Sequence, residues 1–180
     1  MLKSRLCIAF FAFAVGCAPA QKPLTDYVNP MLGTATLWDS VDLGFKPTKR
    51  TWGAEVFPGS SLPNAMVQVS PVTKFHSGAG YQYEDSVIYG FTHTNKGHWN
   101  LCHIPLLPVT GTPTPGDYCS PFSHERESAA PGYYQVFLDR YGVDAQLSST
   151  LRCAFHKYTY PAGAAPAVLA DLQRSNEHVR

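Results

Sequence analysis

Three histidines stand at five-residue intervals in one stretch of the chain, GFTHTNKGHWNLCHIPLLPVTG, residues 90–111. They are His93, His98 and His103, with Trp99 and Cys102 close by. Imidazole and thiolate groups bind zinc, and imidazole also exchanges protons near neutral pH. The stretch therefore raises three alternatives: a metal site, a ligand-binding loop, or an ordinary strand and turn that carries histidines.

The spacing of the histidines argues against a metal site. Residues five apart point to opposite faces of a strand, and on a helix they differ by about 140°. No single regular element can bring all three to one ion, and the C-x₂-C and H-x₃-H spacings of structural zinc are missing. We therefore predict no metal ligands in this chain.

The segment Gly97-His98-Trp99-Asn100 has the composition of a binding loop. Glycine allows a sharp turn, the indole offers a large rigid face, and imidazole and amide supply hydrogen-bond donors and acceptors. Flat rings beside neutral polar groups suit a sugar, which has an apolar C–H face and a rim of hydroxyls. The alternative, in which Trp99 is a core residue and the histidines decorate a strand turn, stays open.

Other catalytic patterns are missing from the sequence. There is no G-x-S-x-G elbow and no glycine-rich phosphate loop. Glu84 and Asp85 are expected to alternate across a strand, and Glu125 and Glu127 to lie in a loop. None of these forms an acid/base pair by spacing, so we predict no catalytic residue within the chain.

The composition limits the class of partner. The formal net charge is +1 and the 14 basic residues are scattered, which argues against nucleic acid, since phosphates require a basic patch. Only 15% of the 180 residues are charged, whereas aromatic residues reach 13%, with ten Tyr and ten Phe. Such a chain is expected to bury its surface against further protein or to present aromatic side chains to a ligand.

The first 16 residues read as a secretory signal. Lys3 and Arg5 form a basic start, an apolar run follows, and the run is too short to span a bilayer permanently. Ala-Val-Gly-Cys at 14–17 resembles a bacterial lipobox, which predicts lipidation of Cys17; simple cleavage near Ala18 or Ala20 is the alternative. Residues 17–26 form a polar tether. We expect a secreted protein, periplasmic or at the outer membrane or cell surface as a lipoprotein, that meets the membrane only through this anchor.

Three further cysteines are Cys102, Cys119 and Cys153, an odd number for an oxidising compartment. One disulfide with one buried thiol and three unpaired cysteines are both compatible with the sequence, because a free cysteine packs like a small hydrophobic residue.

From residue 27 onward the pattern predicts an all-β fold, an antiparallel β-sandwich or barrel. Short apolar or alternating runs recur every 8–12 residues with turn residues between them. Tyr141-Gly142 suits a two-residue hairpin loop, and the interval from Gly33 to Val67 has no clean alternation, which is unusual unless it is functional. The expected strands lie within 64–70, 86–91, 133–141, 143–148, 151–160 and 166–172.

Five segments in order resemble one enzyme family. They are YVNPMLGT (27–34), FPGSSLPNAMVQVSP (57–71), GYQYEDSVIYGFTHT (80–94), IPLLPVTG (104–111) and FSHERESAAPGYYQVFL (122–138). Together they are similar to the N-terminal domain of glycoside hydrolase family 92, the calcium-dependent exo-acting α-mannosidases. The resemblance covers about residues 27–172.

This resemblance implies a β-sandwich followed by a helical, α/α barrel-like domain, with the active site between them. It implies hydrolysis of terminal α-linked mannose in mannans or N-glycans with inversion, by a carboxylic acid and a carboxylate roughly 6.5–9.5 Å apart. It also implies a calcium ion held by oxygen ligands. The family's acid, base and most calcium ligands belong to the helical domain, so we expect residues 27–180 to be an incomplete sandwich that is inactive by itself.

The resemblance further implies that loops of the sandwich line the sugar pocket. We predict substrate contact by His98 and Trp99 in the histidine stretch, and by Gly59 and Ser60 in the PGSS turn. The leading hypothesis is the substrate-shaping part of a secreted α-mannosidase whose partner is the helical domain. The alternative is a free-standing carbohydrate-binding β-sandwich lipoprotein.

Overall fold

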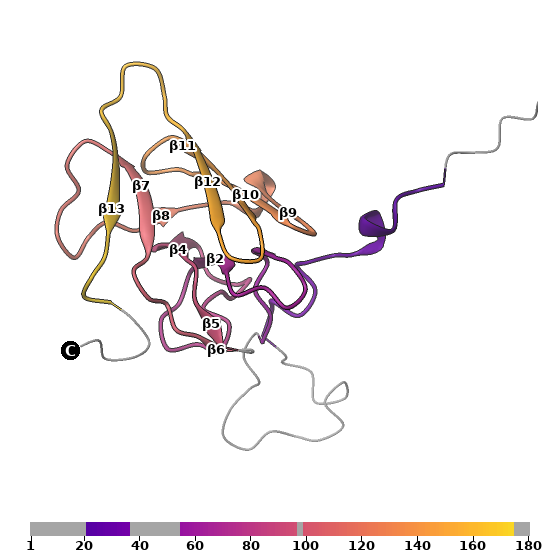
Figure 1. The fold of residues 1–180 in the computed structure, drawn as a ribbon. Helices are drawn as coiled ribbons and strands as arrows, with labels where there is room; N and C mark the ends of the chain where they lie inside the picture. Colours follow the sequence, from indigo (N-terminus) through magenta and orange to yellow (C-terminus); the bar gives the residue numbers. More distant parts are fainter. Residues whose placement is uncertain (1–20, 37–54, 97–98, 175–180) are drawn as a thin grey trace, which may run out of the picture.

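The computed structural model describes residues 21–36, 55–96 and 99–174. In these residues the chain is built from antiparallel strands (Figure 1), which confirms the all-β prediction. The helical elements there are two short 3₁₀ turns, η1 (Leu24–Tyr27) and η2 (His124–Arg126). Among the described residues no helix has the length and apolar character needed to cross a membrane.

One sheet has five strands in the order β1-β2-β4-β7-β13. These strands are β1 (Ser60–Ser61), β2 (Gln68–Val72), β4 (Gly90–Thr92), β7 (Leu106–Thr110) and β13 (Pro166–Ala170). Every pairing in it is antiparallel, with Ser60 opposite Val69 and Phe91 opposite Leu106.

The second sheet has four strands in the order β12-β11-β10-β9, which lie side by side in Figure 1. They are β9 (Glu127–Ala130), β10 (Tyr133–Leu138), β11 (Val143–Ser149) and β12 (Ala154–Thr159). Two ribbons complete the described structure: β3 (Val87–Ile88) pairs with β8 (Ser120–Pro121), and β5 (Asn95–Lys96) pairs with β6 (Trp99–Asn100).

The two larger sheets share one core. Along β10 and β11 every second side chain is buried, as the period of a strand requires when one face is covered. These inward residues form a single cluster with side chains of the five-stranded sheet. The largest fully buried members are Tyr81, Tyr134, Phe91, Ile88, Leu107, Leu138 and Leu147.

The expected strand at 86–91 is divided in two by Gly90. The backbone of Gly90 has φ +154°, and a Cβ there would lie 2.9 Å from the Pro105 Cβ. The residues before it, in β3, pair with β8, whereas those after it, in β4, pair with β2 and β7. The glycine thus lets one short segment serve two sheets.

The turn between β10 and β11 corrects the prediction of a two-residue hairpin loop. Leu138 pairs with Val143, so the loop contains four residues, 139–142, closed by a bond from the Gly142 N–H to the Leu138 carbonyl (2.9 Å). Gly142 does have positive φ, +64°. The longer loop forms because its side chains are anchored: the Tyr141 hydroxyl donates to the Tyr118 carbonyl at 2.6 Å.

The acidic residues and the cysteines allow further comparison of the sequence predictions with the described structure. Glu84 lies in a turn and Asp85 just after it, not in the expected strand, and Glu127 begins β9, not a loop. Among the described residues, Cys102, Cys119 and Cys153 form no disulfide with one another. Cys17 and the middle of the 33–67 interval lie outside the described residues.

Candidate functional site

The PGSS turn lies where the two sheets meet. Gly59 passes so close to β2 that a Cβ there would lie 2.0 Å from the Val69 carbonyl oxygen. Ser60 is fully buried, and its hydroxyl is 2.7 Å from that of Ser149 on β11. In the described structure both residues therefore contact the protein itself, and their contact with a sugar stays a prediction.

The histidine stretch forms a small ribbon and then a strained return. In β6 the backbone of Trp99 pairs with Lys96, while His98 lies outside the described residues. After the ribbon, Cys102 and Ile104 adopt positive φ values of 51° and 47°. Non-glycine residues enter this region at a cost of roughly 1–2 kcal/mol, and such strain concentrates at functional sites. Burial also raises the pKa of the Cys102 thiol to about 12, so this cysteine is not a nucleophile at neutral pH.

Of the three histidines, His93 is paired with a residue that is distant in the sequence. His93 Nε2 lies 2.7 Å from His156 Nε2 on β12, and His156 Nδ1 lies 2.7 Å from the Tyr158 hydroxyl. One of these nitrogens donates and the other accepts, so the accepting ring is neutral in this arrangement. Burial lowers the pKa of His93, and burial together with the nearby His93 lowers that of His156 to about 4.

Two buried polar atoms in this region have no partner among the described residues. They are His103 Nε2 and Gln68 Oε1. Gln68 is held beside the stretch, because its N–H donates to the His93 carbonyl at 3.4 Å. Buried polar groups normally have a hydrogen-bond partner, so these two atoms point to a polar group that completes the site.

A calcium ion does not fit the described part of this region. Calcium takes six to eight oxygen ligands, chiefly carboxylates and carbonyls. In residues 21–36, 55–96 and 99–174 no group of three or more His, Cys, Asp or Glu side chains is placed to hold a metal. The His93–His156 pair supplies two nitrogens, which a hard cation does not prefer.

The histidine pair predicts a specific loss of stability in acid. The unfolded chain protonates His156 near pH 6.5, but the folded chain does so only near pH 4, because the charged form is disfavoured by burial and by His93. Between these pH values the unfolded state binds more protons, so the free energy of unfolding falls as the pH falls. After a discount for partial exposure, we expect a loss of about 2 kcal/mol from this residue.

Denaturant unfolding at pH 7.5 and pH 4.5 measures this effect. His156→Phe should reduce the difference between the two pH values, whereas Lys157→Gln, on the exposed side of the same strand, should leave it unchanged. An unaltered pH dependence in His156→Phe would contradict the assignment.

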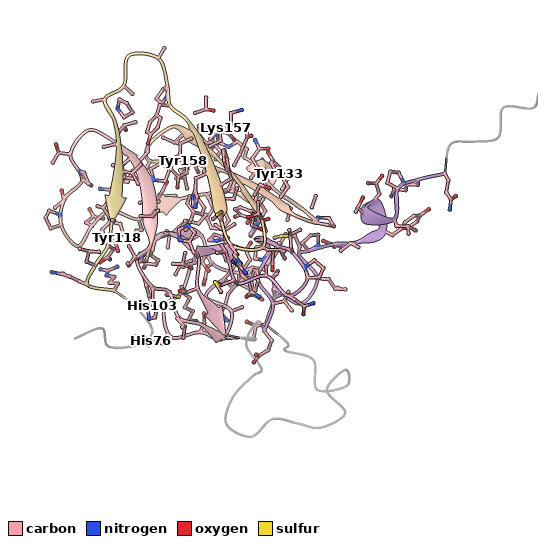
Figure 2. All side chains as sticks on the ribbon, in the orientation of Figure 1. His76, His103, Tyr118, Tyr133, Lys157 and Tyr158 are labelled. Carbon is pink, nitrogen blue, oxygen red and sulfur yellow. The ribbon has the colours of Figure 1, made fainter. Side chains whose placement is uncertain are left out.

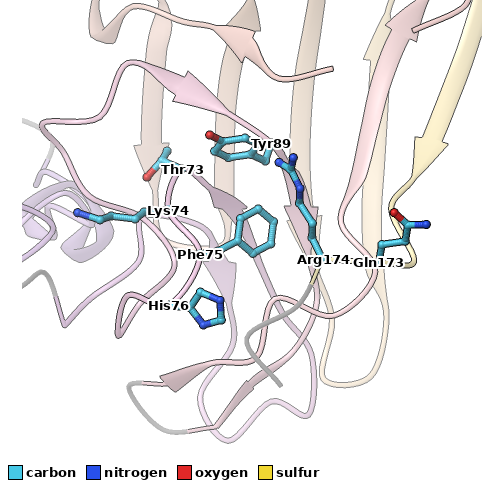
Figure 3. A pocket seen from close by; sticks show the side chains of 7 residues that line it. All are labelled: Thr73, Lys74, Phe75, His76, Tyr89, Gln173 and Arg174. Atoms are coloured by element: carbon cyan, nitrogen blue, oxygen red, sulfur yellow. The ribbon is translucent and has the colours of Figure 1, made fainter. Parts of the chain in front are cut away.

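A cavity of about 480 Å³ opens beside the histidine stretch (Figure 3). The backbone N–H of Asp171, just after β13, donates to the carbonyl of Pro105 in the histidine stretch (3.0 Å). This bond holds the segment that follows β13 against that stretch. Figure 3 shows the Phe75 ring between Tyr89 and His76, with Arg174 beside them. The lining residues are Thr73, Lys74, Phe75, His76, Tyr89, Gln173 and Arg174.

The lining combines flat rings with fixed donors. The centroids of Phe75 and Tyr89 are 5.4 Å apart at 59°, and the Arg174 guanidinium lies 5.4 Å from the Tyr89 centroid and 5.3 Å from that of Tyr118. Stacking on two rings holds the guanidinium in place as a donor. Rings, a guanidinium and the Gln173 amide can bind a polyhydroxylated ligand, but the lining has no carboxyl group to serve as general acid or base.

No local sequence pattern predicts this cavity. Its residues come from three separate parts of the chain, 73–76, Tyr89 and 173–174, so no local motif joins them. The nearest sequence signal is the glycine-rich run SGAGY at 77–81, which predicts a tight loop but does not show which distant segment packs beside it.

A buried carboxylate was also missed. The Glu127 side chain is 2% exposed. It accepts hydrogen bonds from Tyr81 (3.0 Å), from Tyr134 (2.6 Å) and from His124 Nδ1 (2.5 Å). His124 Nε2 lies 2.7 Å from the Tyr83 carbonyl, so both nitrogens of the ring face oxygen atoms of the protein. Burial and the Glu127 carboxylate raise the pKa of Tyr81 and of Tyr134. The group is a hydrogen-bond network centred on a buried carboxyl inside the sandwich.

Comparisons of the sequence and of the structure with known proteins agree on one enzyme family. The model of the glycosyl hydrolase family 92 N-terminal domain matches residues 27–180. Among solved structures, a family GH92 α-mannosidase from Bacteroides thetaiotaomicron in complex with mannoimidazole has 31% identity and a TM-score of 0.71, over 86% of this chain and 20% of that one.

Two further solved structures are similar. The GH92 family glycosyl hydrolase ccman5 has 29% identity and a TM-score of 0.65, over 84% of this chain and 21% of that chain. A family GH92 inverting mannosidase from Bacteroides thetaiotaomicron VPI-5482 has 27% identity and a TM-score of 0.66, over 84% and 20%. The chain thus spans about a fifth of the length of these solved proteins. No curated protein matches it in sequence.

Proposed function

The chain belongs to glycosyl hydrolase family 92, whose N-terminal domain it matches over residues 27–180, and we propose on this premise that it shapes the substrate site of a secreted inverting α-mannosidase. The substrate class is terminal α-linked mannose in mannans or N-glycans. One observation carries the proposal: a solved relative with 31% identity over 86% of this chain is an α-mannosidase bound to mannoimidazole.

In this proposal the histidine stretch and the cavity beside it face the sugar. The rings of Phe75 and Tyr89 offer apolar faces for the C–H side of a pyranose, and Gln173 and Arg174 offer donors to its hydroxyls. His103 Nε2, buried without a partner among the described residues, is a further candidate for a hydroxyl contact. His98, Trp99, Gly59 and Ser60 remain proposed contacts.

The chain's own role is to bind and orient, not to transfer protons. Inversion requires a general acid and a general base on opposite sides of the glycosidic bond. The cavity lining has no carboxyl group, and Glu127 is enclosed by its donors. We therefore assign the acid, the base and the calcium ligands to a helical domain outside this chain, and we expect residues 1–180 alone to release no mannose. A signal at 1–16 and a lipid on Cys17 would place the protein outside the cytoplasm.

Proton NMR tests this function on the full-length protein, by which we mean this chain together with the proposed helical domain. With an α-linked mannobiose, an inverting enzyme releases β-mannose first, before mutarotation. First release of α-mannose would refute inversion, and no release would refute the hydrolase. If mannose oligosaccharides bound to a protein that releases none, the free-standing carbohydrate-binding alternative would be favoured.

Trp99→Ala should lower kcat/KM for mannobiose more than tenfold in the full-length protein. A tryptophan face against a sugar contributes both apolar area and ring contacts, which alanine removes. Trp99→Phe, which keeps a flat ring, should lose less. Steady-state kinetics with thermal unfolding as a fold check measure this, and unchanged kinetics in Trp99→Ala would remove the residue from the pocket.

A further inference from the structure

The outer face of the four-stranded sheet is polar and aromatic, not simply solvated. On β10, β11 and β12 the residues between the buried ones point away from the core. The strand register aligns them in three rows. The rows are Tyr133–Ser148–Phe155, Gln135–Gln146–Lys157 and Phe137–Asp144–Thr159. We call these nine residues the outer face; Figure 2 labels Tyr133 and Lys157 on it.

A continuous set of hydrogen bonds fixes the polar side chains of the outer face. The Tyr133 hydroxyl donates to Gln135 Oε1 at 2.9 Å, and Gln135 Nε2 donates to Asp144 Oδ1 at 2.7 Å. Gln146 Nε2 donates to the other oxygen of Asp144, also at 2.7 Å. Each amide keeps one further N–H, and the Gln146 oxygen is not engaged by these bonds. The array is therefore pre-organised for additional hydrogen bonds.

Two aromatic rings flank a small residue in the first row. Tyr133 and Phe155 lie on strands separated by β11, so their backbones are about 10 Å apart, twice the usual strand spacing. Ser148 lies between them, and its hydroxyl donates to the Gly132 carbonyl at 3.0 Å. Phe155 is 73% exposed, which is a high value for a phenylalanine.

The face is also hollowed at its β9 side. A cavity of about 330 Å³ is lined there by Gln135, Phe137 and Asp144 together with residues 125–128. The Arg126 guanidinium lies 4.0 Å from the Phe137 centroid and is paired with Asp139, so its charge is matched. Asp144 and Lys157 are the acidic and basic members of the outer face, which therefore has no excess of either sign.

We propose that the outer face is a second carbohydrate-binding site, which takes a neutral oligosaccharide chain. Flanking rings meet the C–H faces of pyranoses, and a carboxylate between two amides meets their hydroxyls. Balanced charge favours neutral over anionic glycans. The site does not depend on the hydrolytic function, because it is built from side chains that point away from the core.

Strand β12 shows that the two sites are distinct. His156 and Tyr158 point inward, where His156 contacts His93, whereas Phe155 and Lys157 alternate with them and point outward. Substitution of Phe155 therefore removes a ring from the outer face without touching the His93–His156 pair.

Affinity gel electrophoresis of the full-length protein tests the proposal, with soluble α-mannan in the gel and polygalacturonic acid as the anionic comparison. We expect retardation by mannan only, a five- to tenfold weaker apparent Kd in Phe155→Ala and in Gln146→Ala, and in Tyr133→Ala/Phe155→Ala only the weak retardation that the unchanged catalytic site contributes. Leu24→Ala, at a position with similar exposure (78%) but on η1, should match the wild type. If the double variant fails to fold, the two single variants decide.

Hydrolysis of mannobiose by the same variants separates the two proposals. It should be unchanged, because a disaccharide at the catalytic site does not need the outer face. Equal mannan affinity in all variants, retardation by polygalacturonic acid alone, or parallel loss of mannan affinity and mannobiose hydrolysis would each overturn the inference. Retardation of a wild-type protein that hydrolyses nothing would refute the mannosidase and leave the outer face as a binding site.

Discussion

Glu127→Ala is expected to lower the free energy of unfolding by about 3–5 kcal/mol, because each buried donor that is left without an acceptor costs about 1–3 kcal/mol. The substitution removes the acceptor of Tyr81, Tyr134 and His124 at once. Two tyrosine hydroxyls in the core would lose their acceptor, and the His124 ring would lose its contact at Nδ1. Equilibrium unfolding in urea measures the loss.

Two variants isolate the cause of this loss. Glu127→Gln keeps the shape and one acceptor oxygen, and should cost less because fewer buried donors are left without an acceptor. Glu125→Ala, an exposed carboxylate two residues earlier, should change the free energy of unfolding by no more than about 0.5 kcal/mol. A Glu127→Ala protein as stable as the wild type would show that the network has no energetic role.

Gly59→Ala should lower the free energy of unfolding by about 3 kcal/mol, the upper end of the usual cost of overpacking. The added Cβ would lie 2.0 Å from the Val69 carbonyl oxygen and 2.6 Å from the Ser70 Cα. Both are backbone atoms of β2, so they cannot move aside without breaking the pairing of β1 with β2. Ser60 would be displaced with them, and with it the hydroxyl contact to Ser149.

Gly163→Ala is the matched control for this prediction. Gly163 has φ +76° but nothing within 4 Å of an added Cβ. Its substitution should therefore cost only the left-handed backbone penalty of about 1 kcal/mol. Chemical denaturation of both variants compares the stability lost through steric overlap at Gly59 with the stability lost through left-handed backbone at Gly163. Equal losses at the two positions would contradict the packing explanation for Gly59.

These two predictions bear on the proposed site. The PGSS turn carries two residues that we predicted to contact sugar, yet the described contacts of Gly59 and Ser60 are with β2 and β11. A loss of the proposed mannosidase activity in Gly59→Ala would therefore need a stability measurement beside it. If stability holds while KM rises, the turn contacts substrate.

Strand positions could be predicted from the sequence because burial on one face imposes a period of two. The segments 133–138 and 143–149 show it directly, and both are strands with alternate side chains buried. The family resemblance likewise came from ordered local segments, and the family match over residues 27–180 confirms it. The loop at 139–142 was predicted too short, because its length depends on a contact with Tyr118 that no local pattern reveals.

Local sequence alone determined the all-β class, most of the strands and the family, since each rests on residues that are neighbours in the chain. The tertiary structure decided the partners: His156 beside His93, three donors around Glu127, and Arg174 beside Phe75. These groups come together only through strand register and sheet packing. Pairings between residues 46 and 63 positions apart leave no periodic trace in the sequence, because each partner satisfies only its own local strand pattern.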